Sequence, residues 1–387
     1  MDSMERARFV ERFTDEIEEG TAAIFAGAGF SAAAGHVNWR ELLRDIAEEL
    51  GLDVDRETDL IGVAQFHVNR RLGNRDQLNR AIIHELGGAA KPTQNHLLLS
   101  RLPIRTWWTT NYDTLIEDAQ RDENRIPDVK HTKSQLAHTK PRRDAIIYKM
   151  HGDINHPNEA VLTRDDYECF DRDRQAFLTT LFGDLISKTF LFLGFSFSDP
   201  NLAKVLSHIR VGFETGQRTH YAIFKRPERA DVKTDEDFEY EKRKQILVLE
   251  DLKRFNIQAV LVDKYSEIDD IINDIYRRYI ERYVFISTAA HDYAPWGQGK
   301  VLSFMEKLGA LLIERNLRLV TGVGLGTGNA ILGGAIVSIS ADAEKRIDDQ
   351  ILVRPFPQFV DDPDTRDAMW QSYREDMISR AGIAIFL

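Results

Sequence analysis

The chain alternates between short apolar runs and longer segments in which apolar residues recur at helical spacing. The first apolar run, residues 22–26, reads Ala-Ala-Ile-Phe-Ala. Runs of this length without polar alternation are typical of strands that are buried on both faces of a sheet. Strands that alternate with helices predict a parallel, doubly wound α/β sheet. The further strands predicted in this part of the chain are 106–109, 145–148, 189–193, 220–224 and 258–262.

The segments between these strands differ in character. Residues 59–102 predict a helical subdomain, with breaks at Gly73, at Gly87-Gly88 and at Pro92. Residues 122–144 are polar and basic without clear periodicity, so we interpret them as a loop. Residues 265–281 form an amphipathic helix that we expect to end the first domain.

A second alternation of strands and helices follows and predicts a second Rossmann-like α/β domain. We therefore divide the chain into residues 1–281 and 282–387. The chain stops on an apolar, buried-looking strand, and a helix normally follows such a strand to cover the sheet. We therefore expect that the C-terminal part of the second domain is missing from this sequence. The strands predicted here are 283–286, 318–320, 351–354 and 383–387.

Composition narrows the class of protein. A length of 387 residues favours two domains, and 43% hydrophobic with 29% charged residues is ordinary for a globular protein. The net charge of −11 argues against a general nucleic-acid role. No apolar stretch reaches membrane-spanning length and no signal pattern opens the chain, so we expect a cytoplasmic protein. Cys169 is the only cysteine, which excludes an intrachain disulfide and a cysteine-based zinc site. We expect no metal.

The first strand breaks directly into a glycine loop, Ala26-Gly27-Ala28-Gly29, with Ser31 close behind. Glycines let a backbone turn tightly and approach a ligand, and the loop nitrogens can face a phosphate. A tight turn without a ligand would explain this loop equally well when it is taken alone.

Three later clusters favour a ligand-binding loop over a tight turn without a ligand, because each of them follows another predicted strand. They are Asn111-Tyr112-Asp113, His151-Gly152 and Gly194-Phe195-Ser196. Ligands of open parallel sheets bind outside the carboxyl ends of the strands, so we expect the four clusters to converge there.

Taken in order, the four clusters resemble the NAD-binding core of the sirtuins. This resemblance implies that the glycine loop and Ser31 hold the pyrophosphate and that Gly194, Ser196, Asp199 and Asn201 line the far side, near the adenosine ribose. His151 is the candidate general base, since a neutral imidazole accepts a proton near pH 7. Asn111 can bind a ribose hydroxyl or a water with either end of its amide. Asp113 either orients Asn111 or caps the following helix, and we favour the cap.

The second domain has its own glycine loop, Gly324-Leu325-Gly326-Thr327-Gly328, whose spacing departs from the dinucleotide fingerprint. The domain resembles the SLOG fold, which senses or processes nucleotide-derived ligands in other proteins. Backbone nitrogens, hydroxyls and an arginine fork can hold an anionic nucleotide. The expected activator-binding residues are Ser287, Thr288, Gly324, Leu325, Gly326, Arg354, Gln358 and Arg374.

A sirtuin-like core followed by a SLOG-like domain resembles the ThsA effector family of the Thoeris antiphage defence system. The resemblance implies an NAD+ glycohydrolase that releases nicotinamide and ADP-ribose. It implies activation by a cyclic ADP-ribose isomer from a TIR-domain partner enzyme, depletion of NAD+, and a homotetramer or larger assembly. Two alternatives stay open. One is a zinc-free sirtuin-like deacylase, which the missing zinc module disfavours, and the other is a non-catalytic nucleotide sensor.

Overall fold

The computed structural model describes residues 3–36, 39–88, 90–197, 199–212, 216–289, 292–357 and 360–387. The chain divides into two compact units, Met1–Asp274 and Ile275–Leu387. Helix α15 (Ser266–Ile280) runs across this boundary. No helix in the described part of the chain is both long enough and apolar enough to cross a membrane.

The first unit is built on a seven-stranded sheet in the order β3-β4-β2-β1-β5-β6-β7, and every pairing is parallel. The strand order reverses beside β1, since the chain runs from β1 outward to β2 and later returns to β5 on the other side. The predicted parallel α/β sheet is confirmed. The strands are β1 Ala22–Ala26, β2 Thr106–Thr109, β3 Pro127–Lys130, β4 Ala145–Lys149, β5 Thr189–Leu193, β6 His220–Lys225 and β7 Ile257–Val262.

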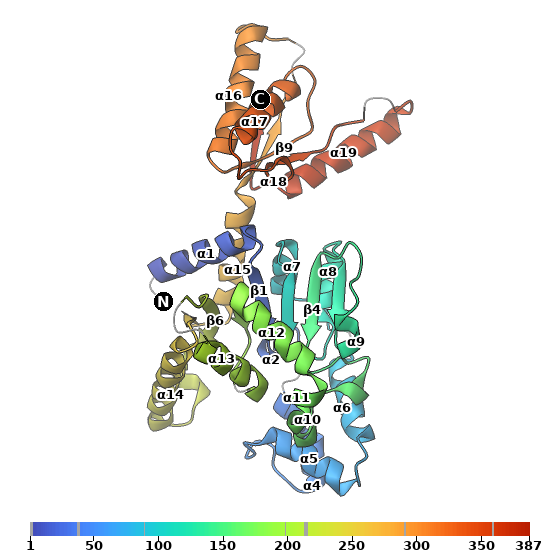
Figure 1. Cartoon of the computed structure of the whole chain (residues 1–387), viewed down its shortest axis with the longest axis vertical. Helices are drawn as coiled ribbons and strands as arrows, with labels where there is room; N and C mark the ends of the chain where they lie inside the picture. Colours follow the sequence, from blue (N-terminus) through green and yellow to red (C-terminus); the bar gives the residue numbers. More distant parts are fainter. Residues whose placement is uncertain are drawn as a thin grey trace. The chain divides into compact units, whose positions relative to one another are not determined.

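Helices cover both faces of this sheet. Alternate strand residues, such as Phe25 and Phe192, pack against Phe177 and Leu181 of α12 (Gln175–Ser187) on one face. Figure 1 shows α12 and α13 (Pro200–Gly212) in front of the strands. On the other face, α1 (Ser3–Glu18) contacts β6 through its aromatic rings. The remaining helices around the sheet are α2 Ala28–Ala32, α7 Gln94–Arg101, α8 Leu115–Asp122, α9 Lys133–Leu136, α11 Phe170–Asp173 and α14 Asp235–Lys253, with two 3-10 turns at Pro157–Glu159 and Arg229–Asp231.

A helical subdomain with its own core is formed by helices between β1 and β2 in the sequence, together with α10, which follows β4. Its buried residues include Leu43, Val63 and Leu78, and they pack together with Tyr112 and Leu162 from the sheet loops. Figure 1 shows α4, α5, α6 and α10 gathered beyond the arrowhead end of β4. The predicted helical segment is thus present, and its breaks fall between helices. These helices are α3 Trp39–Leu42, α4 Arg44–Leu50, α5 Leu60–Arg70, α6 Asp76–Leu86 and α10 Arg164–Glu168.

The prediction that residues 122–144 form a loop is wrong in part. Strand β3 and helix α9 lie within this range. The strand reads Pro-Asp-Val-Lys and begins with proline at the edge of the sheet, where a missing backbone N–H is tolerated. Its polar side chains Asp128 and Lys130 are buried and pair with each other at 2.7 Å, so no apolar pattern marks it.

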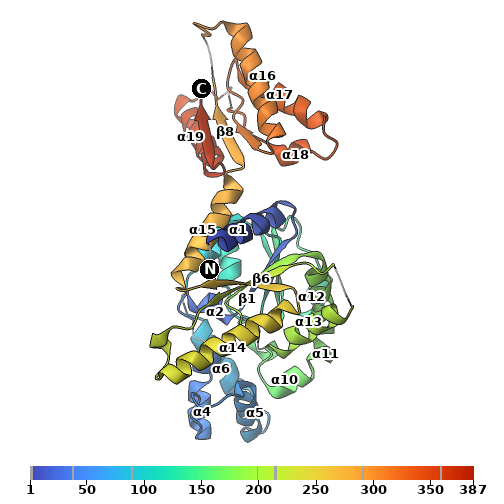
Figure 2. The same cartoon turned by 90° about the vertical axis from the view of Figure 1, so that its left-hand side faces the viewer.

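The second unit holds a four-stranded parallel sheet in the order β10-β9-β8-β11. Figure 2 shows β8 between α19 on one side and α16 with α17 on the other. Helices α16 and α17 cross closely, because an added Cβ on Gly334 would lie 1.8 Å from the carbonyl oxygen of Glu306. The elements are β8 Tyr283–Ser287, α16 Gln298–Glu314, β9 Arg318–Thr321, α17 Gly328–Ser340, α18 Ile347–Gln350, β10 Ile351–Val353, α19 Pro363–Ser379 and β11 Ile383–Phe386.

Strand β11 forms as predicted. It pairs with β8 at the edge of the sheet, and Ile383 and Phe386 are 40% and 65% exposed.

Candidate functional site

Two loops meet at the carboxyl ends of β1 and β5, where the strand order of the sheet reverses. The N–H of Gly27 donates to the carbonyl of Leu193, and the N–H of Gly29 donates to the carbonyl of Gly194, both at 2.9 Å. A Cβ on Gly27 would lie 2.5 Å from the Gly194 oxygen. Gly194 has φ +60°, and a Cβ there would lie 2.1 Å from the Phe30 nitrogen. These glycines are therefore required for the two loops to approach each other.

The surface of these loops is accessible. Ala28, Gly29, Gly194 and Ser196 are exposed, while Ala26 is buried at the end of β1. The exposed backbone lies next to helix α2, which is too short to add much of a helix dipole. The loops therefore present main-chain groups and one hydroxyl to a ligand.

Asn111 lies beside the glycine loop and is held by three hydrogen bonds. Its Nδ2 donates to the carbonyl of Gly27 at 2.9 Å and to Oγ of Ser31 at 2.8 Å. Its backbone N–H donates to the hydroxyl of Thr109 at 2.9 Å. The Ser31 hydroxyl in turn donates to Oδ2 of Asp113 at 2.7 Å. Residues from the two segments that follow β1 and β2 thus form one buried network.

This network determines which way the Asn111 amide points. Asp113 accepts through both of its oxygens, from the Leu115 N–H and from the Ser31 hydroxyl, so the Ser31 proton is committed to it. Ser31 Oγ and the Gly27 carbonyl then both need a donor, and Nδ2 supplies both protons. The amide oxygen Oδ1 is left as the end of Asn111 that can act on a ligand. The sequence left both ends of the amide open, and the structure selects the oxygen.

Asp113 has the orienting role, and it contacts the start of the following helix although the N-cap residue of that helix is Thr114. Its Oδ1 accepts from the N–H of Leu115, the first residue of α8, at 3.0 Å. Its Oδ2 orients Asn111 through Ser31. The helix contact predicted from sequence is present, and it is accompanied by the orienting contact.

His151 is buried directly after β4, at the same edge of the sheet. Its ring lies against the edges of Tyr167 and Phe170, with centroids 5.6 and 5.9 Å away. Its Nε2 lies 3.1 Å from Oδ2 of Asp199, at ion-pairing distance although not aligned as a hydrogen bond. Apolar walls and one carboxylate therefore surround the imidazole.

The sirtuin resemblance implies that Asp199 lies near the adenosine ribose, whereas in the structure Asp199 lies beside His151. Its Oδ1 accepts from the N–H groups of Asn201 and Leu202 at 2.9 Å, which caps α13. Burial alone would raise the pKa of Asp199, but the neighbouring His151 and the two N–H groups outweigh burial and lower it. Asp199 is therefore an ionised partner for His151. Asn201 is buried beside it, and its Nδ2 has no partner among the described residues.

Lys149 is a further residue of this edge to which the sequence assigned no role. It is the last residue of β4 and is 0% exposed, although lysine is rarely buried without partners. A lysine that ends an apolar strand two residues before His151 is the signal that could have identified it.

In the second unit, the expected activator-binding residues follow β8, β9 and β10. The hydroxyl groups of Thr288 and Thr327 hydrogen-bond at 2.6 Å. A Cβ on Gly324 would lie 1.5 Å from the carbonyl oxygen of Thr288, so this glycine lets the two loops meet. Ser287 ends β8 next to them, Leu325 is 55% exposed, and Gly326 has φ +83°.

The two arginines of this group already have partners. Arg354 Nε lies 3.4 Å from Oδ2 of Asp376, and the guanidinium of Arg374 lies over the Phe356 ring at 5.7 Å. Gln358 lies outside the described residues. The structure thus places the loops of β8 and β9 together and holds the two arginines on or beside α19.

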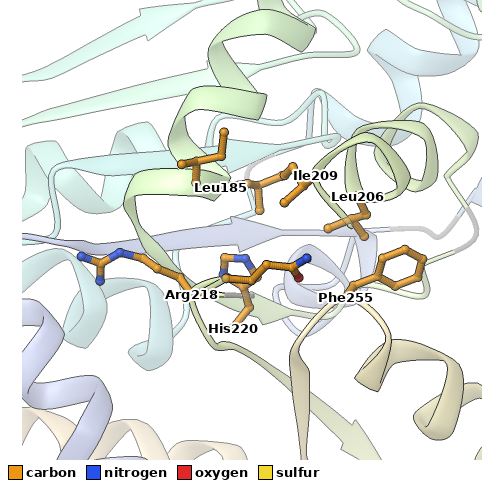
Figure 3. A pocket seen from close by; sticks show the side chains of 9 residues that line it. Leu185, Leu206, Ile209, Arg218, His220 and Phe255 are labelled. Carbon is orange, nitrogen blue, oxygen red and sulfur yellow. The ribbon is translucent and has the colours of Figure 1, made fainter. Parts of the chain in front are cut away.

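A separate pocket lies in the first unit at the other end of the strands, away from their carboxyl ends. Figure 3 shows its lining side chains, which include Leu185, Leu206 and Phe255. His220 is the first residue of β6 and Phe255 precedes β7, so the pocket faces the amino ends of the strands. It is not part of the site around Asn111 and His151. Among the described residues, no group of three or more His, Cys, Asp or Glu side chains is placed to hold a metal ion.

Comparison with known proteins gives two family matches. The model of a SIR2-like domain matches residues 105–249, and that of the Sir2- and TIR-associating SLOG family matches residues 267–387. Three curated relatives are each named NAD(+) hydrolase ThsA. The relative from Acinetobacter baumannii (strain 532279) is 48% identical over 99% of this chain and 79% of its own length. Those from Bacillus cereus (strain MSX-D12) and Enterococcus faecium are each 45% identical, over 98% and 99% of this chain and 79% and 81% of their own lengths.

Proposed function

The chain belongs to the family of ThsA NAD(+) hydrolases, with a SIR2-like and a SLOG domain, and from this premise we propose how its own residues act. Residues 1–281 hydrolyse NAD+ to nicotinamide and ADP-ribose, and residues 282–387 sense a nucleotide that switches the hydrolysis on. The observation that carries this proposal is the Ser31–Asp113 network. It uses both protons of the Asn111 amide, which leaves the amide oxygen to accept a hydrogen bond from a ligand at the same end of the strands as His151.

Hydrolysis breaks the bond between nicotinamide and the ribose C1′. The electron pair leaves with nicotinamide, which is neutral once released, and C1′ develops positive charge that water captures. In our proposal, Oδ1 of Asn111 accepts a hydrogen bond from a ribose hydroxyl or from the attacking water. His151 takes the proton that the water loses. The carboxylate of Asp199 stabilises the imidazolium that results, as carboxylates beside catalytic histidines do.

The remaining contacts to the substrate come from the two glycine loops. We propose that the main chain of Gly27, Ala28 and Gly29 forms the surface against which the pyrophosphate lies. The N–H groups of Gly27 and Gly29 already donate to Leu193 and Gly194, so the donors to the phosphates are the N–H of Ala28 and the Ser196 hydroxyl. The exposure of residues 28, 29, 194 and 196 supports this assignment. Asn201 lies on the adenosine side, with a buried amide nitrogen available as a donor. Ser31 acts through Asn111, because its proton is committed to Asp113.

For the second unit we propose a binding site for a cyclic ADP-ribose isomer. The loops that carry Ser287, Thr288 and the segment 324–326 supply main-chain and hydroxyl donors. Arg354, Gln358 and Arg374 supply charge and amide contacts. The ligand comes from a TIR-domain partner enzyme. Binding shifts the chain towards its active state only if the ligand has a higher affinity for that state.

We propose that in the cell the protein is a cytoplasmic enzyme that depletes NAD+ as an antiphage defence. We also propose that the chain acts as a homotetramer or larger assembly. An uncontrolled NAD+ hydrolase would drain its own cell, so a ligand-controlled switch is expected. The second domain is the candidate for that switch.

One assay tests the proposed activity and its control together. The purified chain is incubated with NAD+, and nicotinamide and ADP-ribose are measured by chromatography. Parallel samples receive the small-molecule filtrate of a TIR-domain enzyme that has been incubated with NAD+. We expect equal amounts of the two products and a rate that increases with the filtrate. A rate that the filtrate leaves unchanged would contradict the activation, and NAD+ left intact in every sample would contradict the activity.

A further inference from the structure

We propose that Lys149 is a positioning residue whose buried ammonium group locks the loop that carries Asn111 onto the loop that carries His151. The proposal rests on the catalytic roles proposed for Asn111 and His151. Lys149 would contact neither NAD+ nor water. It would instead set the distance between the two groups that act on them.

Four oxygen atoms surround the Lys149 ammonium group within 3.0 Å. Two of them are main-chain carbonyls of the loop after β2, Tyr112 at 3.0 Å and Asp113 at 2.6 Å. The other two are carboxylate oxygens, Glu117 Oε1 at 3.0 Å and Asp153 Oδ2 at 2.6 Å. An ammonium group has three N–H donors, so all of them are used, and one is shared.

Three of these four partners come from the segments that flank the proposed catalytic residues, and the fourth, Glu117, lies on α8. Tyr112 and Asp113 directly follow Asn111 in the chain. Asp153 lies two residues after His151, and Lys149 lies two residues before it. The N–H of Ile154 adds a second link, because it donates to the Tyr112 carbonyl at 2.9 Å. Both loops are thus attached to one point, and that point is the lysine nitrogen.

The cluster is electrostatically stable with the lysine charged. Burial alone would lower the pKa of Lys149, but Glu117 and Asp153 outweigh burial and raise it. Asp153 also accepts from the backbone N–H and the side-chain amide of Asn155, at 2.9 and 2.8 Å. A buried charge with all its donors satisfied has one well-defined geometry, whereas a partly satisfied one does not. Rigid placement is what a positioning residue has to supply.

The sheet offers a matched control for a buried lysine. Lys130 on the neighbouring strand β3 is 5% exposed and pairs with Asp128 at 2.7 Å. It lies opposite Tyr148 in the ladder, one residue from Lys149 along β4. Its partners Asp128 and the His138 carbonyl both lie outside the loops that carry Asn111 and His151. Lys130→Met therefore removes a buried lysine from the same sheet and leaves the contacts of Lys149 with the two loops intact.

The test compares the full-length variants Lys149→Met, Lys149→Gln and Lys130→Met with the wild type. Nicotinamide release is measured at a temperature below every melting transition, with a fixed amount of the TIR-enzyme filtrate as activator. A misplacement of about 1 Å in a catalytic constellation costs about 100-fold in rate. We expect Lys149→Met to lose about 100-fold in kcat with KM for NAD+ changed less than about 3-fold on the same reasoning. Lys149→Gln, which keeps two N–H donors for the carbonyls, should recover part of kcat.

Lys130→Met should lower the melting temperature but keep kcat, and this separates positioning from stability. Equal losses of kcat in the two Met variants, or a wild-type kcat in Lys149→Met, would overturn the proposal. If Lys149→Met does not fold, Asp153→Asn decides. It weakens the hydrogen bonding of Lys149 to the His151 loop and should lower kcat, and an unchanged kcat would overturn the proposal.

His151→Ala distinguishes a failure of the proposed function from a failure of the role proposed for Lys149. A wild-type rate in that variant contradicts the proposed function itself, whereas an inactive His151→Ala with a normal Lys149→Met contradicts only the role of Lys149.

Discussion

Replacing Ser31 with alanine separates two roles that this serine could have. The hydroxyl either holds the pyrophosphate of NAD+, as the sirtuin resemblance implies, or orients Asn111, as the network indicates. In the structure, Ser31 is buried, donates to Asp113 at 2.7 Å and accepts from Asn111 at 2.8 Å. Ser31→Ala removes both of these hydrogen bonds and leaves Asn111 attached through the Gly27 carbonyl.

The structure allows the cost to be worked out. A hydrogen bond to a charged group contributes about 1.5–3 kcal/mol, and one between neutral groups about 0.5–1.5 kcal/mol. The two bonds together predict a loss of about 2–4.5 kcal/mol in the free energy of unfolding. Only the bond to Asn111 bears on the amide orientation, and its 0.5–1.5 kcal/mol corresponds to about a 2- to 12-fold decrease in kcat.

The assay is nicotinamide release as a function of NAD+ concentration, with urea unfolding measured on the same preparations. Ser100→Ala is the control, since Ser100 is buried on α7 and accepts from the amide of Gln120 at 3.2 Å. It should lower stability without changing kcat. We expect Ser31→Ala to lower kcat and leave KM nearly unchanged. A raised KM at wild-type kcat would refute the reasoning and return Ser31 to the pyrophosphate site.

Three further predictions concern the loop contact, the sensor and the pH dependence of stability. Gly194→Ala should cost more than about 2 kcal/mol of stability, because its φ is +60° and the methyl group would meet Phe30, whereas Gly183→Ala in open space on α12 should cost nothing in urea unfolding. Arg374→Ala should raise the activator concentration at half-maximal nicotinamide release and keep the maximal rate, and an unchanged midpoint would remove Arg374 from the sensor site. Burial lowers the pKa of His220 to about 4, so the unfolded chain binds its proton first as the pH falls from 6.5, and about 3 kcal/mol of stability should be lost by pH 4. His220→Asn should flatten this part of the pH–stability curve from urea unfolding, and a parallel curve would contradict the assignment.

Much of the fold could be predicted because buried parallel strands leave a plain signal. The run at β1 is apolar throughout and that at β5 is apolar after Thr189, and both ends of each strand were predicted correctly. Strand β3 could not be predicted, since its buried residues Asp128 and Lys130 are charged and neutralise each other only once the fold brings them together. A pattern of hydrophobic positions contains no information about such a pair.

The position of the site could be predicted from the sequence, but the contacts within it could not. Parallel strands end at a common edge, so polar clusters after successive strands can be expected to converge without any knowledge of their contacts. The contacts themselves depend on long-range packing. Ser31 and Asp113 are 82 positions apart in the chain, and Asp199 reaches His151 from the loop after β5. The orientation of the Asn111 amide follows only when these partners are known.

The most direct test of the account is the rate of nicotinamide release by His151→Ala, measured with purified protein, NAD+ and the TIR-enzyme filtrate. A single general base contributes roughly two to four orders of magnitude in rate, so the account predicts a loss of that size. Thermal unfolding of the variant, followed in parallel, should remain cooperative, and NAD+ should still bind through the glycine loops. Nicotinamide release by a folded His151→Ala at the wild-type rate would contradict the account.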